Sequence, residues 1–181
     1  MLDKSKLTGA DISIDFCGCH LQSPYILSSG PLCYGAEGMI KGHEAGAGAV
    51  VTKTIRLGAA INPVHHMGTV NQDSLINCEK WADSDRLNWY ENEIPKTVAA
   101  GAVVIGSVGH TLKEAQAIVK DVERAGAHMI ELVSYPEDTL LPILDSTKEH
   151  VGIPVICKLS GNWPDPAPTA QGLLDTSPHR N

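Results

Sequence analysis

Residues 45–53 read Ala45-Gly46-Ala47-Gly48-Ala49-Val50-Val51-Thr52-Lys53, two glycines followed by an apolar run that ends in polar side chains. Glycine just past a helix adopts the left-handed conformation at low cost and closes the last helical turn. The apolar run is typical of a strand buried on both faces, as in parallel sheets. This stretch therefore predicts a helix end, a tight turn and a buried strand in direct succession.

The same pattern recurs twice further along the chain. Ala-Gly-Ala at 100–102 leads into an apolar run at 103–107, and Ala-Gly-Ala at 125–127 leads into another at 128–132. Segments 25–28 and 154–159 fit as two more strands. Strands that alternate with helices imply a parallel α/β fold.

Helices are expected between these strands. Thr111-Leu112-Lys113-Glu114 is a capping box, in which the first and last side chains satisfy free backbone N–H groups at a helix start. An apolar stripe with helical spacing follows it: Leu112, Ala115, Ile118, Val119 and Val122. Shorter helices are predicted at 37–45, 89–100 and 138–150.

We predict a partial (β/α)8 TIM barrel of about five βα units. A hairpin formed by residues 11–16 and 20–22 is expected to precede it and to cap the bottom of the barrel. The barrel is expected to occupy residues 1–165. Residues 166–181, which follow Pro164 and contain Pro166, Pro168 and Pro178, are expected to form an irregular tail.

Composition excludes several classes of function. The chain has 181 residues, 43% of them hydrophobic, and a net charge of −7 without a long Lys/Arg cluster. This argues against binding nucleic acid or an anionic membrane surface. No apolar run is long enough for a membrane span, and the polar N-terminus lacks a signal-peptide core, so a cytoplasmic location is expected. Five irregularly spaced cysteines are expected to stay reduced.

Polar residues gather where each predicted strand ends: Ser28-Ser29-Gly30, Thr52-Lys53-Thr54, Ser107, Glu131 with Ser134, and Lys158 with Ser160. In a TIM barrel this is the C-terminal rim, where active sites lie. A doubly wound sheet also binds ligands at its strand ends. The absence of GxGxxG after the first strand counts against a Rossmann dinucleotide site. The strand ends therefore predict one shared site.

The segment from 56 to 88 is too long for an ordinary loop and shows little periodicity. Such excursions usually have a function, such as covering a site. Metal binding by His65-His66 or by Cys17-Gly18-Cys19 is the alternative to ordinary surface or strand-edge positions, and we expect no metal at either place.

The order of these elements resembles that of the dihydroorotate dehydrogenases and the related domain of dihydropyrimidine dehydrogenase. The resemblance spans roughly residues 10–165, the N-terminal part of such a barrel. The residues that carry it are Leu27-Ser28-Ser29-Gly30-Pro31, Gly48 to Thr54, Asn77, Glu131 to Pro136, and Lys158-Leu159.

The resemblance implies an FMN-dependent oxidoreductase that acts on a CH–CH bond of a pyrimidine-type ring and passes hydride to flavin N5. Ser29 and Gly30 would pack against the isoalloxazine ring, and Lys53, with Thr54 beside it, would contact the flavin and face the substrate. Asn77 would bind the substrate. Lys158 would reach the N1/O2 edge, where a cation stabilises the charge of the reduced flavin.

Two departures from the family qualify this expectation. The fourth-strand loop reads Val133-Ser134-Tyr135-Pro136-Glu137, so Tyr135 stands where the family has its Cys or Ser base. Tyrosine, with an unperturbed pKa of about 10, is a reluctant base at neutral pH. Asn77 is followed by Cys-Glu-Lys-Trp instead of the family's Met-Gly.

The family also anchors the FMN phosphate after strands seven and eight, which this chain is not expected to supply. The alternative is therefore a truncated, catalytically inert barrel fragment that acts, if at all, through a homo-oligomer or a partner chain completing the barrel. A further alternative is a Schiff-base lyase on the same barrel, with Lys53 or Lys158 as nucleophile.

Overall fold

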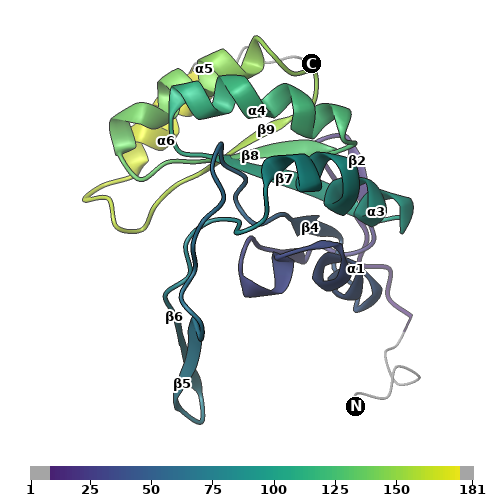
Figure 1. Cartoon of the computed structure of the whole chain (residues 1–181). Helices are drawn as coiled ribbons and strands as arrows, with labels where there is room; N and C mark the ends of the chain where they lie inside the picture. Colours follow the sequence, from purple (N-terminus) through teal and green to yellow (C-terminus); the bar gives the residue numbers. More distant parts are fainter. Residues whose placement is uncertain (1–8, 176–181) are drawn as a thin grey trace.

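A computed structural model describes residues 9–175 of the chain (Figure 1). At its centre is a parallel sheet with the spatial order β3, β4, β7, β8, β9. These strands span Ile26–Leu27, Ala49–Val51, Val103–Gly109, Met129–Val133 and Val155–Lys158. Neighbours in space thus follow one another along the chain, without the reversal of a doubly wound sheet. The predicted fold class, a partial TIM barrel of the α/β class, is confirmed.

Helices cover one face of this sheet (Figure 1). Right-handed crossovers between parallel strands added in one direction place all connecting helices on the same face. The helices are α1 (Ala36–Glu44), α2 (Arg86–Asn88), α3 (Ile94–Ala99), α4 (Leu112–Arg124), α5 (Leu140–Lys148) and α6 (Ala167–Asp175). Shorter helical turns are η2 (Pro31–Cys33), η3 (Trp89–Glu93, a π-helical turn) and η4 (Glu137–Thr139).

The expectation of an irregular tail after residue 165 was wrong for the part that the structure describes. Helix α6 runs from Ala167 to Asp175, and its Leu173 is buried in the main core. Pro168 lies in the first turn, where a proline is tolerated because that N–H has no helical partner. Pro178 lies outside the described residues.

The glycines of the repeated motif have the backbone conformation that the motif predicts. Gly46, Gly101 and Gly126 have φ of 109°, 88° and 102°. Each donates its N–H to a carbonyl three residues earlier, closing the helix before the next strand begins.

The two faces of the sheet have separate cores. Val50, Val104 and Ile130 face the helices and belong to the large cluster that α4 and α5 complete. The residues one position along each strand point to the opposite, concave face, where Ala49, Val51, Ile105 and Met129 pack together with Leu21.

The N-terminal hairpin consists of β1 (Ile14–Phe16) and β2 (Cys19–Leu21), which pair antiparallel. Cys17 and Gly18 form its turn, both with positive φ, as a type I′ turn requires. Phe16 and Cys19 pack against the concave-face cluster where the strands begin. The hairpin therefore closes the bottom of the half-barrel, as predicted.

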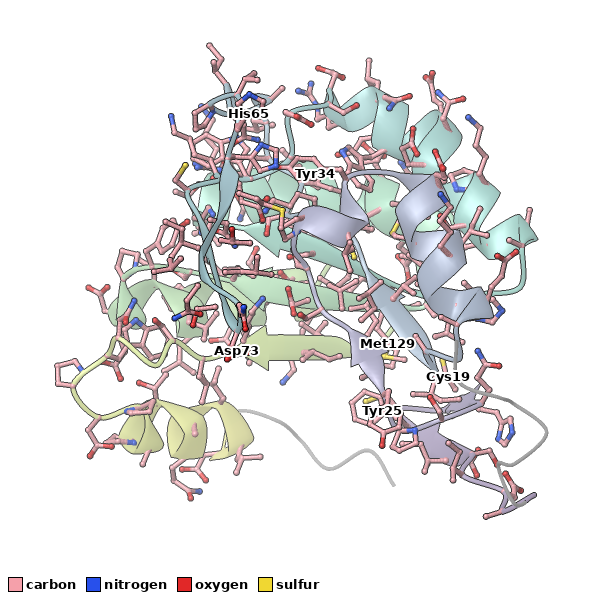
Figure 2. All side chains as sticks on the ribbon, turned by 90° about the horizontal axis from the view of Figure 1, so that it is seen from below. Cys19, Tyr25, Tyr34, His65, Asp73 and Met129 are labelled. Carbon is pink, nitrogen blue, oxygen red and sulfur yellow. The ribbon has the colours of Figure 1, made fainter. Side chains whose placement is uncertain are left out.

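The long segment between β4 and α2 contains a second hairpin, β5 (Met67–Asn71) and β6 (Ser74–Asn77). We call residues 67–77 the arm. All its residues are exposed, and it projects away from the sheet in Figure 1. Figure 2 shows His65 before its base and Asp73 at its tip. None of the helices within residues 9–175 is sufficiently long and apolar to span a membrane.

Candidate functional site

The alternation of side chains along the strands places the predicted site on the concave face. Val51 and Ile105 lie there, so Lys53 and Ser107, two residues further along, point the same way. The register pairs Ser107 with Glu131 and Val133 with Lys158. Polar side chains from four neighbouring strands therefore lie above the apolar floor of the concave face, with Lys158 level with Val133 and so nearer the rim than Glu131.

A cavity of about 280 Å³ opens at this layer. Six predicted site residues line it: Ser29, Lys53, Thr54, Asn77, Tyr135 and Lys158. The seventh, Gly30, lines an adjoining cavity of about 340 Å³, which shares Ser29, Asn77 and Glu79 with the first. The structure thus brings the seven residues to which the resemblance assigned a role to one place. The role of each of them stays a prediction.

Lys53 is held by a buried ion pair. Its Nζ donates to Glu79 Oε1, and the side chains of Lys53 and Glu79 are only 7% and 4% exposed. The same Nζ lies 5.3 Å from the centre of the Tyr34 ring. Burial and then the negative charge of Glu79 raise the pKa of the Tyr34 hydroxyl. Lys53 is therefore a cavity cation whose charge already has a partner.

The Lys158 side chain is more exposed to solvent than that of Lys53. Its Nζ lies 3.6 Å from Glu131 Oε1, and the Lys158 side chain is 43% exposed. Glu131 is buried, and its Oε1 accepts no hydrogen bond within the described residues. Because the ion pair is loose, the Lys158 ammonium retains hydrogen-bonding capacity for an anionic group in the cavity.

Two hydroxyls just after β4 hold the strand ends together. Thr52 Oγ1 accepts from the Ser107 N–H at 2.9 Å, and Thr54 Oγ1 lies 3.1 Å from Ser107 Oγ. Thr54 therefore lines the cavity with a hydroxyl that already bonds to the neighbouring strand.

Tyr135 stacks on His110. Their ring centroids are 4.3 Å apart and their planes differ by 10°. The loop of Tyr135 is braced from two sides, because Trp163 Nε1 donates to the Tyr135 carbonyl at 2.9 Å and Ser134 Oγ donates to the Pro136 carbonyl at 3.1 Å. Tyr135 is thus a fixed aromatic wall of the cavity, with its side chain largely exposed.

His110 is a buried imidazole whose Nδ1 lacks a hydrogen-bond partner among residues 9–175. Burial, reinforced by the positive charge of Arg56, lowers the pKa of His110 to about 4. At neutral pH the cavity is therefore lined by a neutral imidazole, which carries one donor and one acceptor nitrogen.

An ion pair between Arg56 and Glu114 supports this end of the cavity. Arg56 Nε and Nη2 donate to the two carboxylate oxygens of Glu114 at 2.8 and 3.1 Å, and the guanidinium lies 4.1 Å from the centre of the Trp81 ring. Burial alone would raise the pKa of Glu114, but hydrogen bonds from Arg56 and from the His110 N–H lower it below the ordinary value.

Sequence reasoning missed His110 and did not assign Glu79 to the site. His110 lies just beyond the end of β7, which runs to Gly109 and not to residue 107 as expected. Including the residue that directly follows the observed end of the strand would have identified His110 as a candidate site residue. Glu79 has no local signal, because its partner Lys53 is 26 positions away in the sequence.

The residues present fit the ring of a flavin. The two adjoining cavities at this rim are lined by two lysines from different strands. Gly30, which has no side chain, and the side-chain amide of Asn77 also line them. Ser29 and Gly30 would lie against the isoalloxazine ring, and Lys158, whose ion pair is loose, would contact its N1/O2 edge.

Within residues 9–175, no group of three His, Cys, Asp or Glu side chains is placed to hold a metal ion.

Comparison with known proteins supports a relation to one family. No protein-family model matches the sequence. The catalytic subunit of dihydroorotate dehydrogenase B (NAD(+)) from Thermoplasma acidophilum is 30% identical over 176 residues, covering 86% of this chain and 56% of that protein. The subunit of the same name from Thermoplasma volcanium is also 30% identical, over 167 residues, covering 84% and 55%.

A solved structure, phosphonopyruvate hydrolase with oxalate and Mg²⁺, aligns with a TM-score of 0.47 and 21% identity over 76% of this chain and 46% of that chain. The chain spans a little over half the length of the two Thermoplasma subunits. Over most of its own length, it is distantly similar to the N-terminal part of dihydroorotate dehydrogenase catalytic subunits, as the resemblance of its motifs predicted.

Proposed function

We propose that this chain carries the ring-binding part of an FMN-dependent oxidoreductase site that acts on a CH–CH bond of a pyrimidine-type ring. The observation that carries the proposal is the convergence of Lys53 and Lys158 with Ser29, Gly30 and Asn77 around joined cavities. The similarity to dihydroorotate dehydrogenase catalytic subunits supports it. FMN, when bound, would supply the hydride acceptor at N5.

The chain's own residues would divide the remaining work. Lys158 would place its ammonium at the edge of the flavin ring where negative charge develops on reduction. Asn77, which lines both cavities, would bind polar groups of the substrate ring. The stacked Tyr135 and His110 would form an aromatic wall that orients this ring and excludes water from one side.

Tyr135 is the proposed proton acceptor, because it occupies the loop position that the family gives to its base. Replacement by phenylalanine removes the hydroxyl and preserves the stack on His110. We therefore expect Tyr135→Phe to retain FMN and ring binding and to lose substrate-dependent flavin bleaching. Unchanged bleaching in this variant would remove Tyr135 from the mechanism.

The first test is a visible spectrum of the purified chain after incubation with excess FMN and desalting. We expect flavin to be retained near one per chain. Lys158→Gln should weaken retention by about tenfold, the effect of losing one charged hydrogen bond. Lys120→Gln, on the exposed face of α4, is the matched control and should change nothing. A folded but colourless protein would contradict the proposal.

A lyase that works through a lysine Schiff base is less well supported. Schiff-base formation needs a free amine, whereas Lys53 Nζ donates to the buried carboxylate of Glu79 and Lys158 Nζ lies beside Glu131. Borohydride trapping of a carbonyl compound on either lysine would reverse this order of preference.

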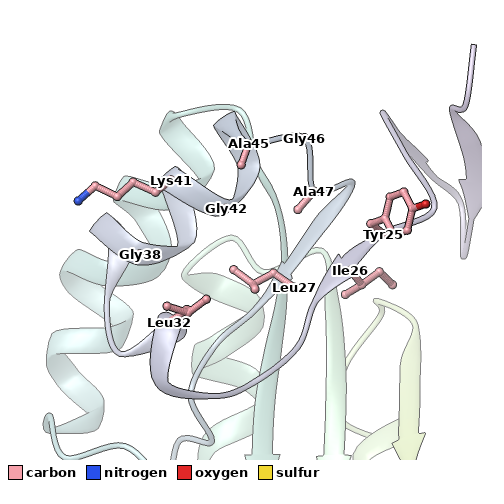
Figure 3. Close-up of a pocket in the computed structure, with 10 residues that line it drawn as sticks. All are labelled: Tyr25, Ile26, Leu27, Leu32, Gly38, Lys41, Gly42, Ala45, Gly46 and Ala47. Carbon is pink, nitrogen blue, oxygen red and sulfur yellow. The ribbon is translucent and has the colours of Figure 1, made fainter. Parts of the chain in front are cut away.

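A second candidate function is that of an inactive barrel part that acts through another chain. The observation that favours it is an apolar groove at each edge of the sheet. A groove of about 550 Å³ lies between β3 and α1, lined by Ile26, Leu27 and Leu32 among others (Figure 3). A groove of about 320 Å³ lies at β9 between α5 and α6. Flavin retention by the isolated chain as a monomer would exclude this candidate.

A further inference from the structure

The Lys53–Glu79 pair changes what the cavity can accept. Lys53 is the cation that the family resemblance places opposite the substrate, and here Glu79 Oε1 accepts its hydrogen bond. Both side chains are more than nine-tenths buried, so water screens the pair weakly. An anionic group brought against Lys53 would therefore meet a compensating carboxylate.

The Glu79 carboxylate also faces Tyr34 and His66. A hydrogen bond with Glu79 contributes to the raised pKa of the Tyr34 hydroxyl, and His66 Nε2 lies 3.8 Å from Glu79 Oε2. Glu79 lines both joined cavities, so a ligand in either one lies within reach of this carboxylate.

We propose that Glu79 is a specificity-determining residue: it makes the cavity select an uncharged ring that offers an N–H donor and reject a ring that carries a carboxylate. The inference rests on the proposed function for the ring class, a pyrimidine. A ring N–H would donate to the Glu79 carboxylate, with the Asn77 amide beside it on the same segment. A site built around a polar partner discriminates strongly against a ligand that leaves the partner unpaired or opposes its charge.

Other charges at the cavity do not reverse this selection. Lys158 has the Glu131 carboxylate next to it, and the hydrogen-bonding capacity that it retains is directed at the edge of the flavin ring in the proposed site. Lys80 also lines the cavity, but it is exposed, and water screens an exposed charge. The buried charges that line the cavity are Lys53, just after β4, and Glu79, and the two cancel.

The test compares two rings that differ by one carboxylate, uracil and orotate (6-carboxyuracil), by isothermal titration of the chain. We expect the wild type to bind uracil at least tenfold more tightly than orotate. Glu79→Gln keeps the shape and an acceptor oxygen but frees Lys53. It should strengthen orotate binding at least tenfold and change uracil binding less than about threefold. Glu79→Asp, which keeps the charge, should preserve the preference.

Glu37→Gln, at an exposed carboxylate on α1, is the matched control and should leave both affinities unchanged. Equal or preferential binding of orotate by the wild type would overturn the inference, whether or not the Glu79 variants fold, and so would failure to bind either ring. Flavin retention, recorded on the same samples, separates the two proposals. Retained flavin with orotate preferred overturns only the role of Glu79, whereas uracil preference without retained flavin overturns only the flavin chemistry.

Discussion

Burial of the His110 imidazole opposes its protonation, and this makes the stability of the folded chain sensitive to acid. Its pKa is about 4 in the folded chain against an ordinary value of 6.5. Between these values the unfolded chain binds more protons, so stability is fully present above pH 6.5 and is lost as the pH falls toward 4. The groups around the imidazole are the Arg56 guanidinium, the Glu114 carboxylate and the Tyr135 ring.

We therefore predict that wild-type protein loses about 2 kcal/mol of unfolding free energy between pH 7 and pH 5 through this one residue. His110→Phe keeps an aromatic partner for Tyr135 and cannot titrate, so its loss over the same range should be smaller by that amount. Urea unfolding of both proteins at each pH measures the difference. Parallel pH profiles would show that His110 becomes protonated in the folded chain without cost.

Single residues also show why sequence reasoning found most of the site but not its selectivity. Lys53 and Lys158 were predicted because each ends an apolar run, and strand ends meet at one rim whatever the details of packing. Glu79 and His110 depend on contacts that only the folded chain makes. The long loop brings Glu79 next to Lys53. The position of His110 is fixed by the ion pair of Glu114 with Arg56.

Among the elements, the long segment from 56 to 88 is the one whose position depends most on side chains. Its first residue, Arg56, donates hydrogen bonds to both carboxylate oxygens of Glu114, and its guanidinium lies over the Trp81 ring. Trp81 Nε1 donates to the Gly58 carbonyl at 2.8 Å, which closes the base of the segment. Beyond this base the arm has no buried residue.

We predict that Arg56→Lys loosens this segment without unfolding the sheet. Lysine keeps the charge but cannot form the two parallel hydrogen bonds of the guanidinium. The loss of one charge-assisted hydrogen bond should cost about 1–3 kcal/mol, felt first in the segment that it anchors. Limited proteolysis should therefore cut the arm several times faster than in the wild type.

Arg124→Lys is the control, because Arg124 makes an exposed pair with Asp121 on α4. It should leave the cleavage rate of the arm unchanged. If Arg56→Lys were cleaved no faster than Arg124→Lys, the base of the segment would be held by backbone contacts such as the Ala82 N–H donating to the Thr54 carbonyl at 3.0 Å.

The regular elements were predictable where local chemistry alone specifies them. The Ala-Gly-Ala turns and the capping box at Thr111 determine where α1, α3 and α4 end or begin, and the structure has them within a few residues of the expected places. The two failures have different causes. Helix α6 is stabilised by packing of Leu173 in the core, and β5 pairs with β6 in a segment without a clear strand period.

At the scale of the whole molecule, the sheet has two edges with unpaired backbone. Within residues 9–175, β3 pairs only with β4 and β9 pairs only with β8. Each edge continues into an apolar groove, and Leu32 and Leu174 beside these grooves are each 66% exposed. Open strand edges beside exposed apolar surface favour association with another chain.

The two edges differ from each other, so self-association would be heterologous, with the β3 edge of one copy against the β9 edge of the next. We predict that the 181-residue chain exceeds its monomer mass of 19.3 kDa in size-exclusion chromatography with light scattering at micromolar concentration. Leu32→Lys and Leu174→Lys should each restore the monomer, because a heterologous contact needs both edges. Leu87→Lys, at an exposed leucine on α2, should not. A monomeric wild type would show that the grooves do not bind a second copy, and one variant acting without the other would exclude the heterologous arrangement.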